Sequence, residues 1–304
     1  MGKRYYSLDH YLKETFGEKV YKIALNGGMT CPNRDGHIGV GGCIFCSADG
    51  SGDFAGSAAL SITEQLAAGK HSLRSKRPVC SYIAYFQAFT NTYGPVGYLE
   101  KIFTEAILDP DVKVLSIATR PDCLDESVIA LLRRLNQIKP VWVELGLQTI
   151  HPQTVQMIRR GYDTEVFDSA VRDLRDAGID VIVHVILYLP GETQEMMLET
   201  IDYLNRRDIQ GIKLQLLYVL ERTDLARLYR SDPFYLPDKE EYIRMLGQCI
   251  LRLRPDVVIH RLTGDGPKDL LIAPLWTGAK RSVLNRLHQY LKENDIWQGK
   301  EYHG

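Results

Sequence analysis

The sequence predicts an α/β protein built as a partial (β/α)6 barrel. Apolar or β-branched runs alternate with helical patterns along the chain, an order that is typical of βαβ units and a parallel sheet. The run "VIVHVILYL" is apolar except for His184, as expected for a strand that is covered on both faces. Six such units can curl into an open or partial barrel, where function gathers at the carboxyl ends of the strands.

Seven runs are expected to be strands, the last of them weakly. They are Val20–Leu25, Cys80–Ala88, Val112–Ala118, Val141–Gln148, Val181–Leu189, Gly211–Val219 and Val257–Leu262. Between them, apolar residues recur about every 3.6 residues, which predicts helices. These patterns cover Leu124–Asn136, Glu165–Ala177, Met196–Leu204 and Glu240–Leu253. Gly178 follows the second pattern and predicts its C-terminal cap.

The barrel is expected to span residues 20–262. A loop over residues 26–56 follows the first strand, so it should lie at the carboxyl ends of the strands. Residues 1–19 and 263–304 are expected to be extensions that pack on the barrel, with helices in the second of them.

Composition narrows the class of protein. Of the 304 residues, 45% are apolar and 25% are charged, which is ordinary for a globular chain. The formal net charge of -1 gives a nucleic-acid partner no overall support and does not exclude one. We expect no signal peptide and no membrane span, because the N-terminus is polar and long apolar runs are missing. Six cysteines fit a reducing cytoplasm, where clustered thiols are usually metal-binding or catalytic.

Three cysteines, Cys31, Cys43 and Cys46, lie in the glycine-rich loop after the first strand. Thiolates at C-x2-C spacing can clasp one metal centre, and two interpretations are open. A structural zinc site would be four-coordinate and would use His37 as its fourth ligand. A [4Fe–4S] cluster held by three cysteines would leave one iron open. The apolar Ile44 and Phe45 inside the pair, and the barrel-like context, favour the cluster.

The loop resembles the cluster motif of the radical S-adenosylmethionine (SAM) superfamily, in which an aromatic residue precedes the last of three cysteines. Its C-x11-C-x2-C spacing departs from the commonest C-x3-C-x2-C form and is similar to long-spaced forms in the branch related to the Elongator catalytic subunit. Six separated motifs occur in order from about Arg4 to about Trp276 and together resemble the bacterial YhcC/YtqA family. They are "CPNRDG…GGC-x-FC", "AYFQAFTNTY", "TRPDCL", "ELGLQT", "LPGET" and "GIKLQLLYVLERT".

This resemblance implies the cofactors. Cys31, Cys43 and Cys46 would bind three irons of a [4Fe–4S] cluster, and the amino and carboxylate groups of SAM would chelate the fourth. Electron transfer into SAM would give methionine and a 5′-deoxyadenosyl radical, which abstracts hydrogen from the target. A low-potential electron donor such as flavodoxin or ferredoxin is implied as a partner.

The resemblance also implies the residues that contact SAM. Phe45 is expected near the adenine. Gln87 stands where many members carry a Gly-Gly-Glu that holds the amino group, and an amide carbonyl can accept from an ammonium. Gln148 and Arg160 have the separation of a glutamine and an arginine that contact the ribose and the carboxylate in coproporphyrinogen-type relatives. His184 stands where relatives often place a carboxylate on the ribose; otherwise it is a satisfied core residue.

The segment "TRPDC" closes the third expected strand. Thr119 is expected on the cofactor side. Arg120 and Asp122 either pair with each other or face the substrate. Cys123 is a candidate hydrogen donor or thiyl relay, although an isolated thiol is more often inert packing.

Lys213, Gln215 and Tyr218 are the candidates on the substrate side. Lys213 and Gln215 alternate along "GIKLQLLYV" and therefore share one face of a strand. A lysine on an inner barrel face is costly unless it is paired or faces a ligand. The segment "HRLTGDGP", residues 260–267, either covers the barrel mouth or is a simple turn.

The substrate class comes from the resemblance. The Elongator-type branch acts on the wobble uridine of tRNA, and the YtqA form, also called MnmL, is implicated in converting 5-carboxymethylaminomethyl-uridine to 5-aminomethyl-uridine. A bound tRNA would have to place a flipped-out base in the barrel mouth. The densest basic stretch, "KHSLRSKRP", either contacts phosphates or is a solvated surface; its basic residues are Lys70, His71, Arg74, Lys76 and Arg77.

Two other functions stay open at this level. One is a radical SAM enzyme that acts on a small metabolite or a protein side chain. The other is a zinc-stabilised, non-catalytic binding protein.

Overall fold

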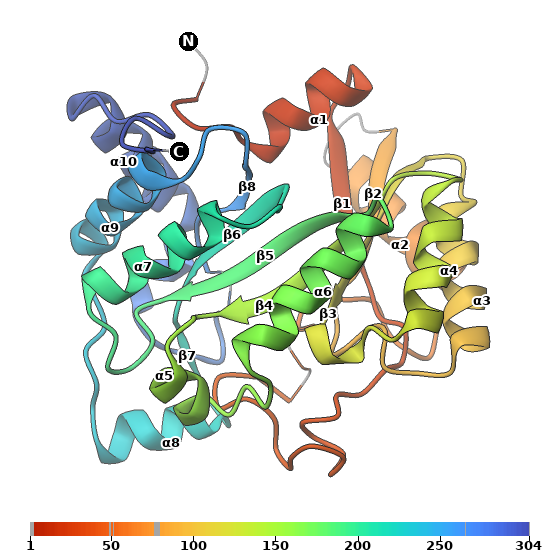
Figure 1. The fold of residues 1–304 in the computed structure, drawn as a ribbon, viewed down its shortest axis with the longest axis horizontal. Coiled ribbons are helices and arrows are strands. Elements are labelled where there is room, and N and C mark those ends of the chain that lie inside the picture. Colours follow the sequence, from red (N-terminus) through yellow and green to blue (C-terminus); the bar gives the residue numbers. More distant parts are fainter. Residues whose placement is uncertain (1–2, 49, 51, 76–79, 265, 304) are drawn as a thin grey trace.

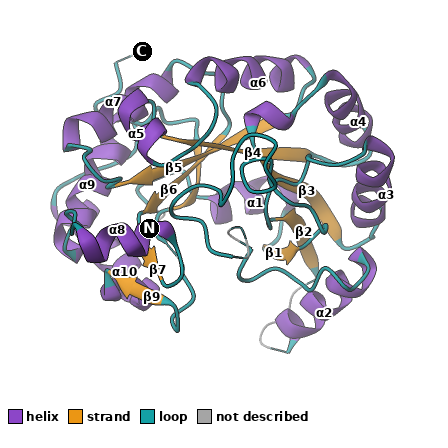
Figure 2. Cartoon of the chain, turned by 90° about the horizontal axis from the view of Figure 1, so that it is seen from below, coloured by secondary structure: helices purple, strands orange, loops and turns teal. Residues whose placement is uncertain are grey.

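The computed structural model describes residues 3–48, 50, 52–75, 80–264 and 266–303. Within them, seven parallel strands form one curved sheet in the order β1-β2-β3-β4-β5-β6-β8. Each strand lies beside its predecessor in the sheet, and helices cover the outer face of the arc (Figures 1 and 2). The predicted α/β partial barrel is confirmed, with a seventh strand where the sequence indicated one only weakly.

All seven expected runs contain a strand. The strands are β1 (Val20–Leu25), β2 (Ser81–Phe86), β3 (Val112–Thr119), β4 (Val141–Gln148), β5 (Asp180–Leu187), β6 (Gly211–Leu216) and β8 (Val258–Arg261). The sixth run is shorter than predicted, because the chain leaves the sheet after Leu216. The next residues form β7 (Val219–Leu220), which pairs antiparallel with β9 (Leu271–Ala273), a strand that the sequence pattern did not indicate.

Ten α-helices are described. They are α1 (Leu8–Phe16), α2 (Ile62–Arg74), α3 (Val96–Ile107), α4 (Glu126–Asn136), α5 (Pro152–Met157), α6 (Thr164–Asp176), α7 (Gln194–Asn205), α8 (Asp224–Ser231), α9 (Lys239–Arg252) and α10 (Lys280–Glu293), and two 3-10 turns cover Pro121–Cys123 and Leu275–Ala279. The four predicted patterns correspond to α4, α6, α7 and α9. None of the helices in the described residues is long and apolar enough to cross a membrane.

Local signals explain where these helices begin and end. Ser61 and Glu64 form a capping box at the start of α2, a helix whose weak apolar periodicity the pattern analysis missed. Gly178 follows the end of α6 with φ 74°, a left-handed conformation that glycine adopts without steric cost. It therefore ends α6 as predicted.

The main core lies between the sheet and the helices. Phe103 on α3 packs edge-to-face on Phe86 of β2, with ring centroids 4.9 Å apart. Along β4, Val143, Leu145 and Leu147 belong to this core. Because side chains alternate along a strand, the residues between them face the inside of the arc. The outer face is therefore apolar, whereas the inner face carries polar groups such as Glu144 beside a smaller apolar cluster that includes Ile83, Val114 and Trp142.

Both ends of the described chain meet at the β8 edge (Figure 1). The carbonyl of Tyr6 accepts from the Ile259 amide at 2.7 Å, so residues before α1 cover the edge strand. The buried Gln298 side chain joins the two ends. Its Oε1 accepts from the Tyr6 amide at 2.9 Å, and its Nε2 donates to the carbonyls of Arg254 and Val257 at 2.9 and 2.8 Å.

Gln298→Ala is expected to lower the free energy of unfolding by about 2–3 kcal/mol, because it removes the partner of the Tyr6 amide and of the Val257 carbonyl and leaves the Arg254 carbonyl with only the Val257 amide at 3.4 Å among the described residues. Urea unfolding followed by circular dichroism measures this. The matched control is Gln289→Ala on α10, whose exposed side chain bonds only to Glu293 at 2.7 Å. Equal losses in the two variants would contradict the role of Gln298.

Candidate active site

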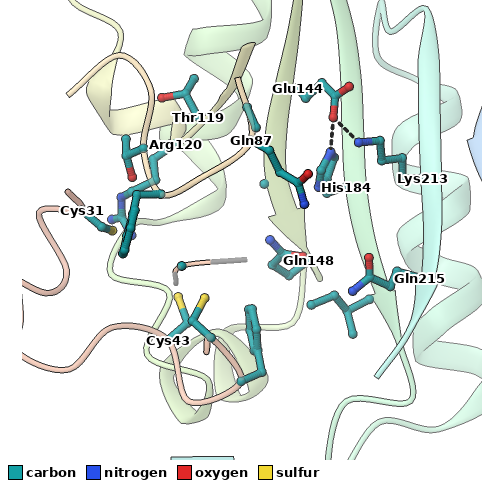
Figure 3. A pocket seen from close by; sticks show the side chains of 18 of the residues that line it. Cys31, Cys43, Gln87, Thr119, Arg120, Glu144, Gln148, His184, Lys213 and Gln215 are labelled. Atoms are coloured by element: carbon teal, nitrogen blue, oxygen red, sulfur yellow. Dashed lines mark hydrogen bonds and ion pairs between the residues drawn. The ribbon is translucent and has the colours of Figure 1, made fainter. Parts of the chain in front are cut away.

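A cavity of about 320 Å³ lies on the inner side of the half barrel. Its lining comes from the loop after β1 and from the inner face and carboxyl ends of the strands (Figure 3). Every predicted site residue except Cys123 lines it. These residues are Cys31, Cys43, Phe45, Cys46, Gln87, Thr119, Gln148, Arg160, His184, Lys213, Gln215 and Tyr218. The structure therefore gathers residues from six strands or their following loops around one space.

The cysteine loop has little regular structure, but side chains hold it in place. The guanidinium of Arg34 donates to the carbonyls of Cys46 at 3.3 Å, Ala48 at 3.1 Å and Ser47. Gly42 has φ 80°, and a Cβ at this position would lie 2.9 Å from Nε of Arg34. Glycine is therefore required where the loop passes the arginine.

A second anchor ties the loop to the segment after α5. Nδ2 of Asn33 donates to the carbonyl of Arg159 at 2.6 Å and lies 3.7 Å from Sγ of Cys43. The Cys43 thiol forms a hydrogen bond with Cys46. This hydrogen bond, together with burial, raises the pKa of Cys43 well above its ordinary value. The pattern analysis did not single out Asn33 and Arg34, although both lie in the quoted motif "CPNRDG".

The arrangement of the thiols bears on the two metal interpretations. Among the described residues, no three His, Cys, Asp or Glu side chains converge on one point as the ligands of a single metal ion must. His37, the fourth ligand in the zinc interpretation, is exposed and does not line the cavity. Because the Cys43 and Cys46 thiols are in hydrogen-bond contact, the fourth ligand rather than the spacing of the thiols separates the two interpretations. The donor set fits a multi-iron cluster better than a closed zinc site.

Gln148 shows that the cavity also fits a polar ligand. It is the last residue of β4 and has φ 65°. This left-handed conformation is strained for any residue other than glycine. Its buried Oε1 has no hydrogen-bond partner in the described part of the chain. A buried amide oxygen without a partner is costly unless a ligand supplies the donor. The amino group or ribose hydroxyls of SAM carry such donors.

Arg160 lines the cavity but is 1% exposed. Its guanidinium donates to the carbonyls of Leu147 at 2.6 Å, Thr149 at 2.8 Å and Tyr162 at 3.0 Å. These bonds fix the end of β4 and occupy most of the donors of Arg160. Its contact with the SAM carboxylate stays a prediction.

The remaining predicted residues near β3 are also placed. Arg120 pairs with Asp122 through contacts of 2.9 and 2.7 Å, which is the simpler of the two alternatives for these residues. Thr119 shares a hydroxyl–hydroxyl bond of 2.5 Å with Thr92. Cys123 does not line the cavity, and burial is the main cause that raises the pKa of its thiol to about 12. Its role as a hydrogen donor stays a prediction.

An ionic cluster occupies the inner face of the sheet, centred on the fully buried carboxylate of Glu144 on β4. Oε1 accepts from Nζ of Lys22 at 2.7 Å and from Oγ of Ser116 at 2.8 Å. Oε2 accepts from Nε2 of His184 at 2.8 Å and from Nζ of Lys213 (Figure 3). The predicted residues His184 and Lys213 thus meet on one carboxylate.

Charge and burial set the protonation states in this cluster. Burial favours the neutral form of the Glu144 carboxyl, but Lys213, Lys22 and His184 outweigh it and hold its pKa well below the ordinary value. Burial, followed by the charge of Lys213, lowers the pKa of His184 to about 4. His184 is therefore neutral near pH 7 and donates Nε2–H to Glu144.

The pattern analysis missed Glu144, Lys22 and Arg261 as cavity residues. A signal was present for Glu144, because a carboxylate inside the apolar run "VWVELGLQ" needs a buried partner. Gln215 accepts from Nη1 of Arg261 at 3.4 Å. Both therefore belong to the same inner face.

Two segments had alternative interpretations in the sequence, the loop over residues 260–267 and the basic stretch "KHSLRSKRP". A Cβ at Gly264 would lie 2.6 Å from the Tyr218 ring, so this part of the loop after β8 packs on a cavity residue, as the covering interpretation expects. In the basic stretch, Lys70 contacts Asp109 at 2.6 Å and Arg74 contacts Asp111 at 3.0 Å.

His71 is exposed on α2. Lys76 and Arg77 of that stretch lie outside the described residues, as does Asp265 of the loop after β8.

Glu144→Gln is expected to lower the free energy of unfolding by about 3 kcal/mol or more, because it leaves buried cations without their carboxylate. Chemical denaturation at pH 7 measures the loss. Glu100→Gln breaks an exposed pair with Arg134 and should cost less than about 1 kcal/mol. An equally small loss in Glu144→Gln would show that the ionic cluster around Glu144 does not stabilise the fold.

Comparison with known proteins identifies the family. The model of the radical SAM superfamily matches residues 31–204, and the model of the Radical SAM C-terminal domain matches residues 209–293. The first match begins at Cys31 and includes all three loop cysteines. The two matches together cover the sheet from β2 to β8.

Three relatives are similar in sequence. YtqA of Bacillus subtilis is 42% identical over 298 residues, which cover 98% of this chain and 92% of YtqA. YhcC of Escherichia coli is 36% identical over 287 residues, which cover 94% of this chain and 91% of YhcC. A tRNA uridine(34) acetyltransferase of Methanocaldococcus jannaschii is 27% identical over 190 residues, 60% of this chain and 33% of that protein.

Among solved structures, the archaeal Elp3 of Methanocaldococcus infernus has the same fold. It superposes with a TM-score of 0.69 at 18% identity over 92% of this chain and 64% of that chain. The chain belongs to the radical SAM superfamily, in the Elongator-related branch with YtqA and YhcC, and is an enzyme whose cofactors are a [4Fe–4S] cluster and SAM.

Proposed function

We propose that this enzyme modifies the wobble uridine of tRNA, converting 5-carboxymethylaminomethyl-uridine to 5-aminomethyl-uridine. The observation that carries the proposal is the sequence similarity to a tRNA uridine(34) acetyltransferase. The 190 residues that the two proteins share are 33% of the acetyltransferase. We infer that the shared part acts on the same kind of nucleoside.

The form of the site agrees with a nucleotide substrate. Lining residues come from inner strand faces as well as from loops, so the cavity reaches into the half barrel. A base within a folded RNA can reach such a site only when it is flipped out of its stack. The cavity carries amide, hydroxyl and charged groups together with Phe45 and Tyr218, as recognition of a base by hydrogen bonds and stacking requires.

The proposal gives each group of cavity residues a role. The cluster and SAM, when bound, supply a 5′-deoxyadenosyl radical that abstracts a hydrogen atom from the substrate. The three loop cysteines hold the cluster, while Phe45, Gln87 and Gln148 bind SAM. Lys213 and Gln215, on the inner face of β6, orient the substrate. Loss of that hydrogen atom and of one further electron, which the cluster would take back, turns the carboxymethylamino group into an imine. Water then hydrolyses the imine to the aminomethyl group and glyoxylate, so the barrel wall must limit water without excluding it.

We also propose that flavodoxin or ferredoxin delivers the electron. The loop cysteines are only partly buried, which leaves the cluster close to the protein surface. A small electron carrier that docks against this loop would then come within electron-transfer distance.

Cys43→Ala is expected to reduce SAM cleavage to the level measured without enzyme, because one iron loses its thiolate. The assay is 5′-deoxyadenosine formation after anaerobic reconstitution and reduction with dithionite, together with iron and sulfide content. Cys80→Ala is the matched control, since Cys80 is exposed and does not line the cavity. SAM cleavage that persists in Cys43→Ala would overturn the assignment of the cluster ligands.

A strain that lacks the gene is expected to accumulate 5-carboxymethylaminomethyl-uridine and to lose 5-aminomethyl-uridine and any nucleoside made from it. Mass spectrometry of nucleosides from bulk tRNA measures both. Complementation with the intact gene should restore the pattern, and the Cys43→Ala gene should not. An unchanged wobble-uridine profile would count against tRNA as the substrate and leave the radical SAM assignment standing.

A further inference from the structure

The inner face of the half barrel carries more positive than negative charge. Lys22, Lys213 and Arg261 line the cavity there, and Glu144 is the carboxylate that contacts the two lysines. In the described part of the chain, no acidic side chain forms a salt bridge with Arg261, whose contact is the neutral Oε1 of Gln215 at 3.4 Å. Among the described residues, Glu144 thus balances two of the three cations, and Arg261 is paired with a neutral amide.

The neutral neighbours do not remove this surplus. Nζ of Lys22 and Nζ of Lys213 lie 4.5 and 4.6 Å from the centroid of the Tyr85 ring, so the ring stabilises both cations without adding a charge. Burial, followed by the charge of Glu144, raises the pKa of the Tyr85 hydroxyl well above its ordinary value, which keeps it protonated. His184 is neutral near pH 7, as described above.

The surplus is costly in this position. The side chain of Lys213 is 4% exposed, and that of Lys22 is 24% exposed. Burial lowers the pKa of the Lys213 ammonium well below its ordinary value. Glu144 acts in the opposite direction and raises this pKa, while Lys22 and Arg261 lower it further. An anion bound here would relieve the repulsion among the cations. Strongly perturbed charged groups in a cavity are typical of functional sites.

The cationic group lies at the far end of the cavity from the cysteines. Glu144 stands four residues before Gln148, the last residue of β4, which places it about 13 Å deeper along the strand. Lys22 and Lys213 likewise lie in the middle of β1 and β6. Figure 3 shows Glu144, His184 and Lys213 at one end and Cys31 and Cys43 at the other, with Gln148 between them.

We propose that Lys22, Lys213 and Arg261 form an oxyanion subsite at the floor of the cavity, which holds a carboxylate at the leading end of the substrate. The inference rests on the proposed function, because a flipped nucleotide enters base first and leaves its phosphates at the mouth. The anion that reaches the floor is then on the base. A carboxymethylaminomethyl group carries a carboxylate in that place, and the aminomethyl product does not.

The subsite itself is tested without RNA. Anaerobically purified protein with its cluster is melted in sodium acetate, inorganic phosphate or sodium chloride at equal ionic strength. Acetate should raise the melting temperature of the wild type above its value in chloride, since a ligand that binds only the folded state stabilises it. Arg261→Gln, which breaks no ion pair among the described residues, should lose the effect, and the exposed Lys292→Gln should keep it. No difference between acetate and chloride would overturn the subsite.

The source of the anion is tested with two anticodon stem-loops. One carries 5-carboxymethylaminomethyl-uridine at the wobble position, and the other carries its carboxamide, which has the same size and no carboxylate. The wild type should bind the first about tenfold or more tightly, and Arg261→Gln should bind both about equally. Equal binding by the wild type would overturn the carboxylate assignment, and a larger melting shift in phosphate than in acetate would then assign the subsite to a phosphate.

Failure of the proposed function gives a different result. If neither stem-loop binds while acetate still stabilises the protein through Arg261, tRNA is not the substrate and the subsite serves another carboxylated molecule. If both stem-loops bind and acetate has no effect, the tRNA function stands and the subsite is wrong.

Discussion

The buried carboxylate of Glu144 is the interaction on which the inner half of this structure depends. It receives hydrogen bonds from side chains on four other strands, at Lys22, Ser116, His184 and Lys213. The half barrel is open, so the sheet ladder does not bring β1, at one edge, into contact with β6, near the other edge. Glu144 links β1 to β6 across the inside of the arc instead. The same carboxylate makes it possible to bury two lysines in this position.

This arrangement separates packing from chemistry. Apolar side chains on the outer face bind the sheet to its helices, as the contact of Phe86 with Phe103 illustrates. The inner face carries the polar groups of the cavity beside a smaller apolar cluster, and the loop held by Arg34 and Asn33 lies over one end of it. A cluster and SAM at the loop, with a cationic floor below, give the cavity a direction. Under the proposed function, a substrate that enters between them would be held at its far end while the reacting carbon faces the radical source.

Much of the fold could be predicted from the sequence, because apolar runs that alternate with helical patterns directly indicate the order of strands and helices in a βαβ fold. The cysteines were also predictable, since their spacing is local. Glu144 was missed as a site residue because its partners lie 122, 40 and 69 positions away, and only the folded chain brings them together. The end of β6 was misplaced because "GIKLQLLYV" stays apolar where the chain leaves the sheet.

The central claim is that radical chemistry at the loop cysteines acts on a tRNA base held in the half barrel. The most direct measurement combines the reconstituted enzyme, SAM, a reductant and tRNA that contains 5-carboxymethylaminomethyl-uridine, and follows 5′-deoxyadenosine and tRNA nucleosides in one reaction. The account predicts that 5-aminomethyl-uridine and 5′-deoxyadenosine rise together as the carboxymethylaminomethyl nucleoside falls. Formation of 5′-deoxyadenosine with an unchanged tRNA would contradict it.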